Sequence, residues 1–276
     1  MSQERGATLS LPSGGPAAGS HPEAFLVADP QLALLLAIVA GGAYVQAVTG
    51  FAFGLVVLGA VALLDLAPLA VMAAVVSVGT FFNTGLALRG CTRRVCWRDA
   101  GPMLAGMLPA VFAGIALLEC LDAGMVATLH AVLACAIIGG GAMLALAPRP
   151  RAVRAGGWQT LAMGAAGGLF TGLLAAGGPP VVYHLYRQPY PVATVRATLL
   201  ATFAIACVAR LGLLALRGGL GPEVIAIALP SIPVVMAATV IGRRFPPPLS
   251  DAWLRRLAFG LLAVLGVLLL AARALP

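Results

Sequence analysis

Two apolar stretches of this chain are too long for one membrane-spanning helix and too short for two. The first runs from Gln31 to Leu64 and the second from Trp158 to Tyr186. An ordinary span needs about 20 apolar residues. Each stretch is interrupted near its middle by a glycine-rich segment, 46–54 in the first and 170–180 in the second. Paired, interrupted apolar segments in two halves of a chain are typical of transporter binding sites.

The composition requires a membrane environment. Of the 276 residues, 61% are hydrophobic and only 9% are charged, whereas a soluble domain carries about 25% charged residues. So few charges could not cover a soluble surface. We therefore predict an all-α, polytopic membrane protein, with the lipid bilayer as its first partner and a membrane domain running from Gln31 to Leu275.

The distribution of basic residues predicts the orientation. All 17 are arginine, and most lie in short segments between apolar runs, at 89–98, 148–155 and 243–256. The positive-inside rule places such segments in the cytoplasm, which predicts a multi-pass protein of the bacterial inner membrane. The same distribution argues against a nucleic-acid partner despite the net charge of +8, because nucleic-acid-binding proteins gather basic residues on one soluble face.

Counting crossings predicts the topology. The helix that begins at Val192 must start on the cytoplasmic side, because this helix and the next one, Pro222–Ile241, together return Arg243 to that side. The stretch 158–186 therefore enters and leaves on the same side, and the same argument makes 31–64 start and finish outside. Each is expected to be a broken helical hairpin. The expected full spans are Ala67–Leu88, Gly101–Leu118, Ala123–Leu146, Val192–Leu216, Pro222–Ile241 and Ala252–Ala272.

The predicted fold is thus a broken hairpin plus three transmembrane helices, repeated twice, with eight to ten membrane segments. We expect a disordered tail at 1–30, a first repeat at 31–147, an arginine-rich cytoplasmic linker at 148–157, and a second repeat at 158–276. Two identities at an offset of 122 agree: Thr49-Gly50 with Thr171-Gly172, and Thr80-Phe81 with Thr202-Phe203. Because each repeat has five segments, an odd number, the second repeat is inverted in the membrane relative to the first. Inverted repeats suit alternating access.

The hairpin breaks are the predicted anion site. Irregular backbone at membrane depth is tolerated where it lines a cavity, and helix N-termini at such breaks favour anions. Glycine allows close approach there, and proline suits the start of a half-helix. Alternatively, the glycines only allow tight helix packing. The expected substrate-binding residues are Gln46, Thr49, Gly50, Gly54, Asn83, Thr171, Gly172, Gly177, Gly178, Pro179 and Arg196.

An arginine within a membrane-spanning helix is expected to have a function. Arg196 lies five residues into the helix from Val192 and is the expected counter-charge, since guanidinium pairs bidentately with a sulfonate or carboxylate. The alternative for Arg196 is a snorkelling side chain. Arg210 is expected near the outer end of the same helix, with a weaker claim on function. His184 could relay a proton, but an interfacial histidine is the preferred interpretation.

The motifs of several other classes are missing from the sequence. It has no phosphate-binding Gly-x4-Gly-Lys-Ser/Thr loop, no His-Glu-x-x-His and no mid-span pair of carboxylates. The five scattered cysteines predict neither a disulfide nor a metal site. We therefore expect a protein that is not an enzyme and that needs no cofactor or metal. An anion leaving a negative-inside cell gains roughly 2.3 kcal/mol per charge per 100 mV, so export needs no coupling ion.

The chain resembles the sulfite exporter TauE/SafE family of bacterial membrane permeases. The resemblance lies in Val45–Leu55, Gly167–Pro180, Arg196–Thr198 and the two-half layout, and it covers most of 31–272. It implies transport of a small anion such as sulfite, sulfoacetate or another sulfonate across the inner membrane. The chain has Leu-Ala-Ala at 174–176, where the family often has a more glycine-rich stretch, and this leaves the substrate open.

We accordingly expect a secondary permease that exports a small organosulfur or related anion. One alternative is a passive anion channel, whose flux would not saturate and which would show no counterflow. A second is a membrane assembly factor without transport. The direction of transport is not fixed by the sequence, and a homodimer is left open.

Overall fold

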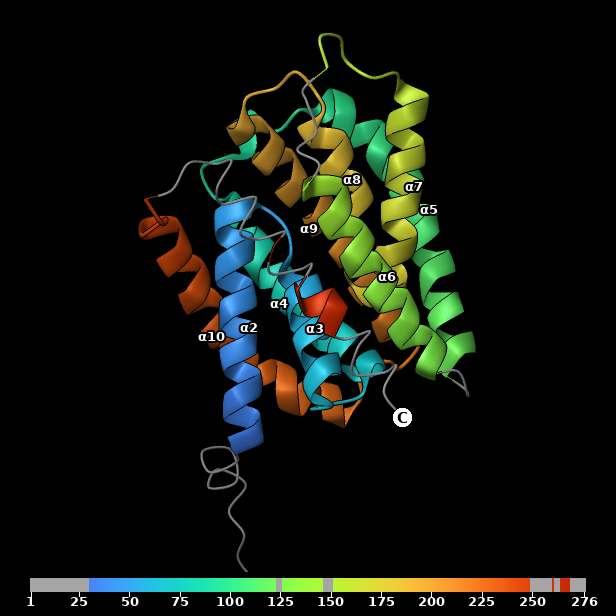
Figure 1. Ribbon diagram of the computed structural model, residues 1–276, viewed down its shortest axis with the longest axis vertical. Coiled ribbons are helices and arrows are strands. Elements are labelled where there is room, and N and C mark those ends of the chain that lie inside the picture. The colour runs from blue at the N-terminus through green and yellow to red at the C-terminus, as the bar shows by residue number, and fades with distance from the viewer. Residues whose placement is uncertain (1–29, 123–125, 146–150, 249–259, 261–263, 269–276) are drawn as a thin grey trace, which may run out of the picture.

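The structure is a computed structural model that describes residues 30–122, 126–145, 151–248, 260 and 264–268 (Figure 1). The tail predicted at 1–30 lies almost wholly outside the described residues. So do most of the last predicted span, Ala252–Ala272, and the start of the linker. The main described helices are α2 (Pro30–Thr49), α3 (Phe53–Leu64), α4 (Leu69–Leu88), η1 (Thr92–Arg94), α5 (Trp97–Asp122), α6 (Val126–Ala145), α7 (Gly157–Leu174), α8 (Gly178–Tyr186), α9 (Val192–Leu216) and α10 (Pro222–Arg244).

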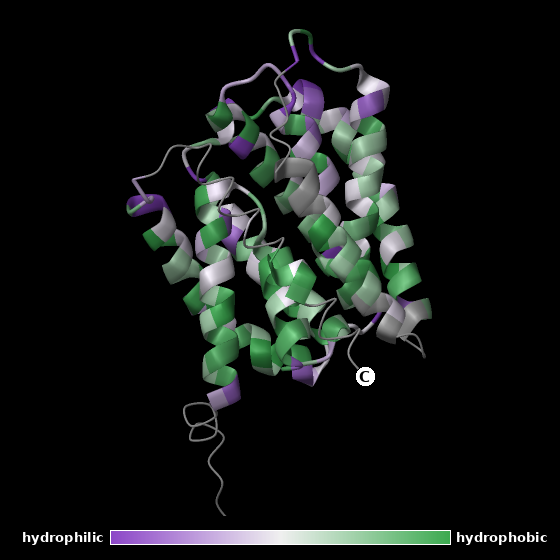
Figure 2. Ribbon diagram, viewed as in Figure 1, coloured by the Kyte–Doolittle hydropathy of each residue, from purple (hydrophilic) through white to green (hydrophobic). Residues whose placement is uncertain are grey.

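The predicted all-α, polytopic membrane class is confirmed. Within the described ranges every regular element is helical. Five helices, α2, α4, α5, α9 and α10, are long and apolar enough to cross a bilayer. Figure 2 shows hydrophobic residues along the length of the bundle, with hydrophilic residues mostly toward its two ends.

Two helices extend beyond their predicted bounds, and charged residues stabilise the start of α5 and the end of α10. α5 begins at Trp97 rather than Gly101, with Asp99 in its first turn, where a negative charge favours the helix dipole. Pro102, which the predicted span Gly101–Leu118 places at the second helical position, therefore lies inside the helix. α10 continues past Ile241 to Arg244, and its last turn carries two arginines, whose positive charge is favourable at a helix C-terminus.

Both predicted interruptions are present, and each is shorter than its glycine-rich segment. Only residues 50–52 separate α2 from α3, and only 175–177 separate α7 from α8. α3 has 12 residues and α8 has 9, too few to cross the hydrocarbon as ordinary helices. Each pair is therefore a longer helix, of 20 residues in α2 and 18 in α7, followed by a half-helix.

The second hairpin returns to the end of the molecule from which it starts. The backbone N–H of Arg151, before α7, donates to the carbonyl oxygen of Arg187, after α8, at 2.8 Å. The N–H of Ala155 donates to Oε1 of Gln188 at 3.0 Å. In the first hairpin, α2 begins and α3 ends at the opposite, lower end in Figure 1. The boundaries of the two repeats stay a prediction, since the third helix of the second repeat is largely outside the described residues.

Arginines from three separate segments meet at one end of the molecule. Arg243 at the end of α10 donates to the carbonyl oxygens of Leu86 and Arg89, and Arg154 in the linker donates to that of Arg98. This is the upper end in Figure 1, and we call it the arginine-rich end. The opposite end carries an exposed ion pair, in which Arg217 contacts Glu119 at 2.5 Å.

Glycines bring α5 and α7 into backbone contact. Gly164, Gly168 and Gly172 follow one another at four-residue spacing on α7, which places them on one face. A Cβ added at Gly168 would lie 2.2 Å from the carbonyl oxygen of Met107, and Gly164 and Gly172 meet α5 carbonyls as closely. This small-xxx-small packing fixes the second hairpin against α5.

Candidate functional site

The two hairpin breaks touch each other. A Cβ added at Gly54, in the first turn of α3, would lie 2.6 Å from the carbonyl oxygen of Ala175, in the second break. Only glycine allows this approach. The start of the first half-helix is therefore packed directly against the interruption of the second hairpin.

A cavity of about 30 Å³ lies beside this contact, and we call it the central cavity. A water molecule needs roughly 10–15 Å³ by the same measure, so the space suits only a small ligand. Its wall comes from both hairpins and from α4 and α9. The lining residues are Gln46, Gly54, Ser77, Thr80, Thr171, Ala175, Ala176, Gly177, Gly178, Phe203, Cys207 and Arg210.

Five of the eleven predicted site residues line the central cavity: Gln46, Gly54, Thr171, Gly177 and Gly178. Gly50 lies in the first break, and Thr49, Gly172 and Pro179 stand in the helix turns that flank the two breaks. Asn83 and Arg196 are not among the lining residues. The sequence thus located the region of the cavity but missed its lining from α4 and α9.

The side-chain amide of Gln46 has one atom that is hydrogen-bonded and one that has no partner among the described residues. The residue is 3% exposed, and its Oε1 accepts a hydrogen bond from the N–H of Phe53 at 3.1 Å. This bond satisfies one of the N–H groups that a helix start leaves without an intrahelical partner. Its Nε2 is buried and has no hydrogen-bond partner within the described residues. Gln46 therefore presents an unsatisfied donor at the cavity wall.

Arg210 is the buried cation of the central cavity. Its residue is 1% exposed. Its Nε donates to the carbonyl oxygen of Gly172 at 3.2 Å, and its Nη1 donates to the carbonyl oxygen of Ala73 at 3.0 Å and to Oγ of Ser77. Its Nη2 has no partner within the described residues. The guanidinium is thus held from two sides, with one donor unused.

The sequence favours Arg196 over Arg210 as the functional arginine of α9, but the structure places Arg210 at the cavity. An arginine well inside an apolar helix was the available signal. A second signal was spacing, since Cys207 and Arg210 on α9, like Ser77 and Thr80 on α4, are three residues apart and share a face. All four line the cavity.

Arg196 lies beside the first break without lining the central cavity. A Cβ at Gly50 would be 3.4 Å from Cγ of Arg196, so the aliphatic part of the arginine packs against this glycine. Gly50 has a φ of +88°, which glycine adopts without strain. The role of Arg196 as counter-charge stays a prediction.

Equivalent threonines, Thr49 and Thr171, lie just before the two breaks. Thr49 Oγ1 donates to the carbonyl oxygen of Val45 at 2.7 Å, and Thr171 Oγ1 donates to that of Gly167 at 2.8 Å. Each hydroxyl therefore bonds back onto the last turn of its own helix. The breaks differ in backbone conformation, but each contains an alanine with positive φ: Ala52, directly before α3, at +85°, and Ala175, directly after α7, at +51°. Non-glycine residues in this region cost on the order of 1–3 kcal/mol each and cluster at functional sites.

Asn83 joins three helices instead of lining the cavity. It is fully buried, and its Nδ2 donates to the carbonyl oxygen of Ala43 at 2.9 Å and to Oγ1 of Thr239 at 2.8 Å. These contacts connect α4 with α2 and α10. The expectation that its amide borders the substrate path finds no contact in its favour.

The electrostatics at the central cavity favour an anion. α3 and α8 both begin there, and the N-terminus of a helix carries a partial positive charge. Pro179 and Pro180 lack an N–H group, so α8 contributes its dipole and few donors, while α3 contributes the donors of its first turn. None of the described lining residues is acidic. The site therefore combines one guanidinium with two helix N-termini.

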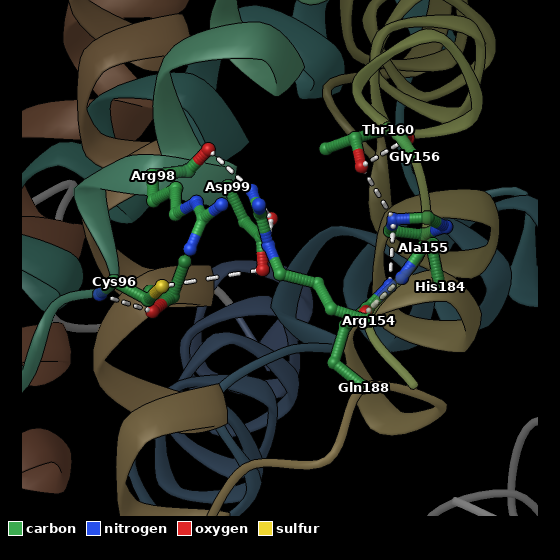
Figure 3. Close-up of polar contacts among 10 residues, drawn as sticks. Cys96, Arg98, Asp99, Arg154, Ala155, Gly156, Thr160, His184 and Gln188 are labelled. Atoms are coloured by element: carbon green, nitrogen blue, oxygen red, sulfur yellow. Dashed lines mark hydrogen bonds and ion pairs between the residues drawn. The ribbon is translucent and has the colours of Figure 1, made fainter. Parts of the chain in front are cut away.

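A second polar cluster lies at the arginine-rich end (Figure 3). Asp99 is fully buried and accepts a hydrogen bond from Nε of Arg154 at 2.6 Å, and this bond raises the pKa of the Arg154 guanidinium. Burial, together with the carboxylate of Asp99, raises the pKa of Tyr190 in the α8–α9 loop. The linker is thereby fastened to the start of α5.

His184 belongs to this end and not to the central cavity. Its Nε2 lies 3.0 Å from Oγ1 of Thr160 and 3.0 Å from Nε2 of Gln188. Because Oε1 of Gln188 accepts the N–H of Ala155, the Gln188 amide donates to the ring, and the ring proton is assigned to Nδ1. His184 thus connects the two ends of the hairpin.

Among the described residues, no cluster of three or more potential ligands could hold a metal ion.

Comparison with known proteins gives a family and a relative. The family model described as "Sulfite exporter TauE/SafE" matches residues 33–269. A protein of Cupriavidus necator described as "Probable sulfite/organosulfonate exporter TauE" is 39% identical over 236 residues, which cover 86% of this chain and 92% of that protein. No solved structure matches the chain.

Proposed function

The chain belongs to the sulfite exporter TauE/SafE family of membrane transporters, and from this premise we propose that it is a secondary permease that exports a compact oxyanion, with sulfite as the best candidate. It acts as a carrier and not as an enzyme. The single observation that supports this most is the pair of unsatisfied donors, Gln46 Nε2 and Arg210 Nη2, in the wall of one cavity.

An oxyanion would satisfy both donors at once. A buried donor without a partner costs about 1–3 kcal/mol, and more for a charged group. The oxygens of sulfite could accept from the amide and from the guanidinium, and hydrogen bonds between charged groups are stronger than neutral ones. The N-termini of α3 and α8 add a field of the same sign.

The size of the cavity favours a compact anion over a long sulfonate. Ala175 and Ala176 both line it, and their methyl groups occupy space beside the second break. An anion with an organic tail would need that space. We therefore place sulfite above larger organosulfonates in the expected order of affinity.

Export fits the charge distribution. We propose that the arginine-rich end faces the cytoplasm, as the positive-inside rule predicts. The membrane potential then drives an anion outward by about 2.3 kcal/mol per charge per 100 mV. Asp99 is the one buried acidic residue in the described part of the chain, and it is paired with Arg154 away from the cavity. The proposal therefore includes no proton or sodium coupling through a carboxylate.

The cavity lies between elements of the two predicted halves, which supports alternating access. Arg210 in α9 bonds both to α4 and to α7. A movement of one half against the other would change these bonds and the wall of the site together. Inverted repeats transport by such movements around a fixed central site.

Counterflow in proteoliposomes tests the proposal. Vesicles loaded with unlabelled sulfite should accumulate external labelled sulfite transiently, with a saturable initial rate. Sulfite should compete better than sulfoacetate. Ala176→Gly removes a methyl group from the cavity wall and should narrow the difference in competition between sulfite and sulfoacetate. Ala176→Val should lower the transport of both anions. Non-saturating flux without counterflow would instead indicate a channel, and no flux or binding of any tested anion would indicate an assembly factor.

A further inference from the structure

A second cavity, with a volume of about 310 Å³, lies at the arginine-rich end between the start of α7 and the end of α8. It shares no lining residue with the central cavity. Its wall contains two arginines, Arg151 and Arg187, and none of its described lining residues is acidic. The cavity therefore has an excess of positive charge, and this charge plays no part in the central site.

The two arginines are held together by the backbone. The N–H of Arg151 donates to the carbonyl oxygen of Arg187 at 2.8 Å, although the residues come from opposite ends of the hairpin. Arg151 Nη1 donates to Oε1 of Gln159 at 2.8 Å. Arg187 Nη1 donates to the hydroxyl of Tyr183 at 3.0 Å, and its guanidinium lies 5.4 Å from the centroid of that ring. These partners are neutral, so they orient both guanidinium groups without neutralising them.

The wall becomes apolar one helical turn further into α7. Trp158 is in the first turn and is 78% exposed, and large aromatic side chains of this kind are enriched at the membrane–water interface. Ala162 and Met163 follow four residues after Trp158 and Gln159, so they lie on the same face one turn deeper. The cavity thus has a cationic rim and an apolar floor.

We propose that this cavity binds an anionic phospholipid from the leaflet at the arginine-rich end. The phosphate lies between Arg151 and Arg187, and an acyl chain follows Ala162 and Met163 along α7. Basic pockets between transmembrane helices are suited to such headgroups. A free anion would use the arginines and leave the apolar wall uncovered, which is why the lipid is the assigned occupant. The bound lipid would hold the two ends of the second hairpin together.

The test is lipid binding to the purified full-length protein in detergent. Phosphatidylglycerol, phosphatidylcholine and soluble glycerol 3-phosphate are each added, and retention is measured by native mass spectrometry alongside the melting temperature. Phosphatidylglycerol should be retained and should raise the melting temperature, whereas the other two should not. The double variant Arg151→Gln/Arg187→Gln should weaken its binding by about tenfold or more, because charge-assisted hydrogen bonds are lost.

Two matched variants complete the design. Arg93→Gln/Arg94→Gln removes two exposed arginines from the same end, and it should bind phosphatidylglycerol as the unaltered protein does. Arg151→Lys/Arg187→Lys retains both charges and should keep part of the binding, which separates loss of charge from loss of fold. Equal binding of phosphatidylcholine would refute the proposal. So would equal loss in the Arg93/Arg94 variant, or equal stabilisation by glycerol 3-phosphate alone. Added sulfite should not displace the lipid, so this result is independent of the transport proposal.

Discussion

Nε of Arg210 donates a hydrogen bond to the carbonyl oxygen of Gly172, 3.2 Å away. Gly172 lies in the last turn of α7, just before the second break, and its missing side chain lets α5 approach on the other face. The same guanidinium bonds to Ala73 and Ser77 on α4. One arginine therefore connects α9 with an element of each predicted half at the wall of the central cavity.

Arg210→Gln should weaken sulfite binding about 10- to 100-fold, because a hydrogen bond to a charged group contributes about 1.5–3 kcal/mol. The measurement is sulfite titration by isothermal calorimetry or by thermal shift on purified protein. Arg217→Gln is the matched control, since Arg217 ends the same helix in an exposed ion pair. It should bind sulfite normally.

The two arginines of α9 can be separated in the same experiment. Arg196 packs against Gly50 and is not part of the cavity wall. We expect Arg196→Gln to lower the transport rate more than it lowers sulfite affinity. The opposite result, with affinity lost in Arg196→Gln and kept in Arg210→Gln, would make Arg196 the counter-charge.

Gln46→Glu should lower sulfite affinity by about tenfold or more. The bound sulfite would lose the amide donor, and a buried charged group that lacks a hydrogen-bond partner costs more free energy than a neutral one. The new carboxylate retains the oxygen that accepts the N–H of Phe53, but it replaces the free amide donor by an acceptor that repels the anion. Gln46→Met, which removes the cap and adds no charge, should have a smaller effect on affinity and a larger one on the melting temperature. Undiminished affinity in Gln46→Glu would remove this residue from the site.

Gly168→Ala should destabilise the protein by about 1–3 kcal/mol, the usual cost of overpacking. Its Cβ would lie 2.2 Å from a backbone carbonyl of α5, and backbone cannot move aside as a side chain can. Gly212→Ala in α9 is the control, because nothing lies within 4 Å of its added methyl group. The melting temperature in detergent should fall for the first variant and hold or rise for the second.

Asp99→Asn should lower the free energy of unfolding by about 1–3 kcal/mol. Breaking a fully buried ion pair costs ~3–5 kcal/mol. The cost here should be smaller because the Arg154 side chain is 24% exposed. The exposed pair Glu119–Arg217 provides the comparison, and Glu119→Gln should change stability by about 0–1 kcal/mol. Thermal denaturation of both variants measures the difference. Equal shifts would mean that the Asp99–Arg154 pair does not hold the linker to α5.

The interrupted stretches, the helical class and the positions of the breaks were accessible from sequence because they depend on local properties. Membrane insertion follows from the length and polarity of a segment, and glycine and proline interrupt helices wherever they occur in number. The return of 158–186 to its starting side was likewise accessible, because arginines constrain orientation one loop at a time. The hydrogen bond between Arg151 and Arg187 agrees with that prediction.

The partners of each side chain were decided by the tertiary structure alone. Arg196 and Arg210 are about four turns apart on one helix. The depth of Arg210 in that helix and its spacing from Cys207 are local signals, but they do not fix which arginine lies level with the breaks of two hairpins elsewhere in the chain. Asn83 is equally suited to a cavity by its residue type, yet its Nδ2 bonds to α2 and α10. A contact across the bundle depends on how helices distant in sequence are rotated and shifted against each other. That is set by the packing of the whole chain, here by glycine faces such as 164–172.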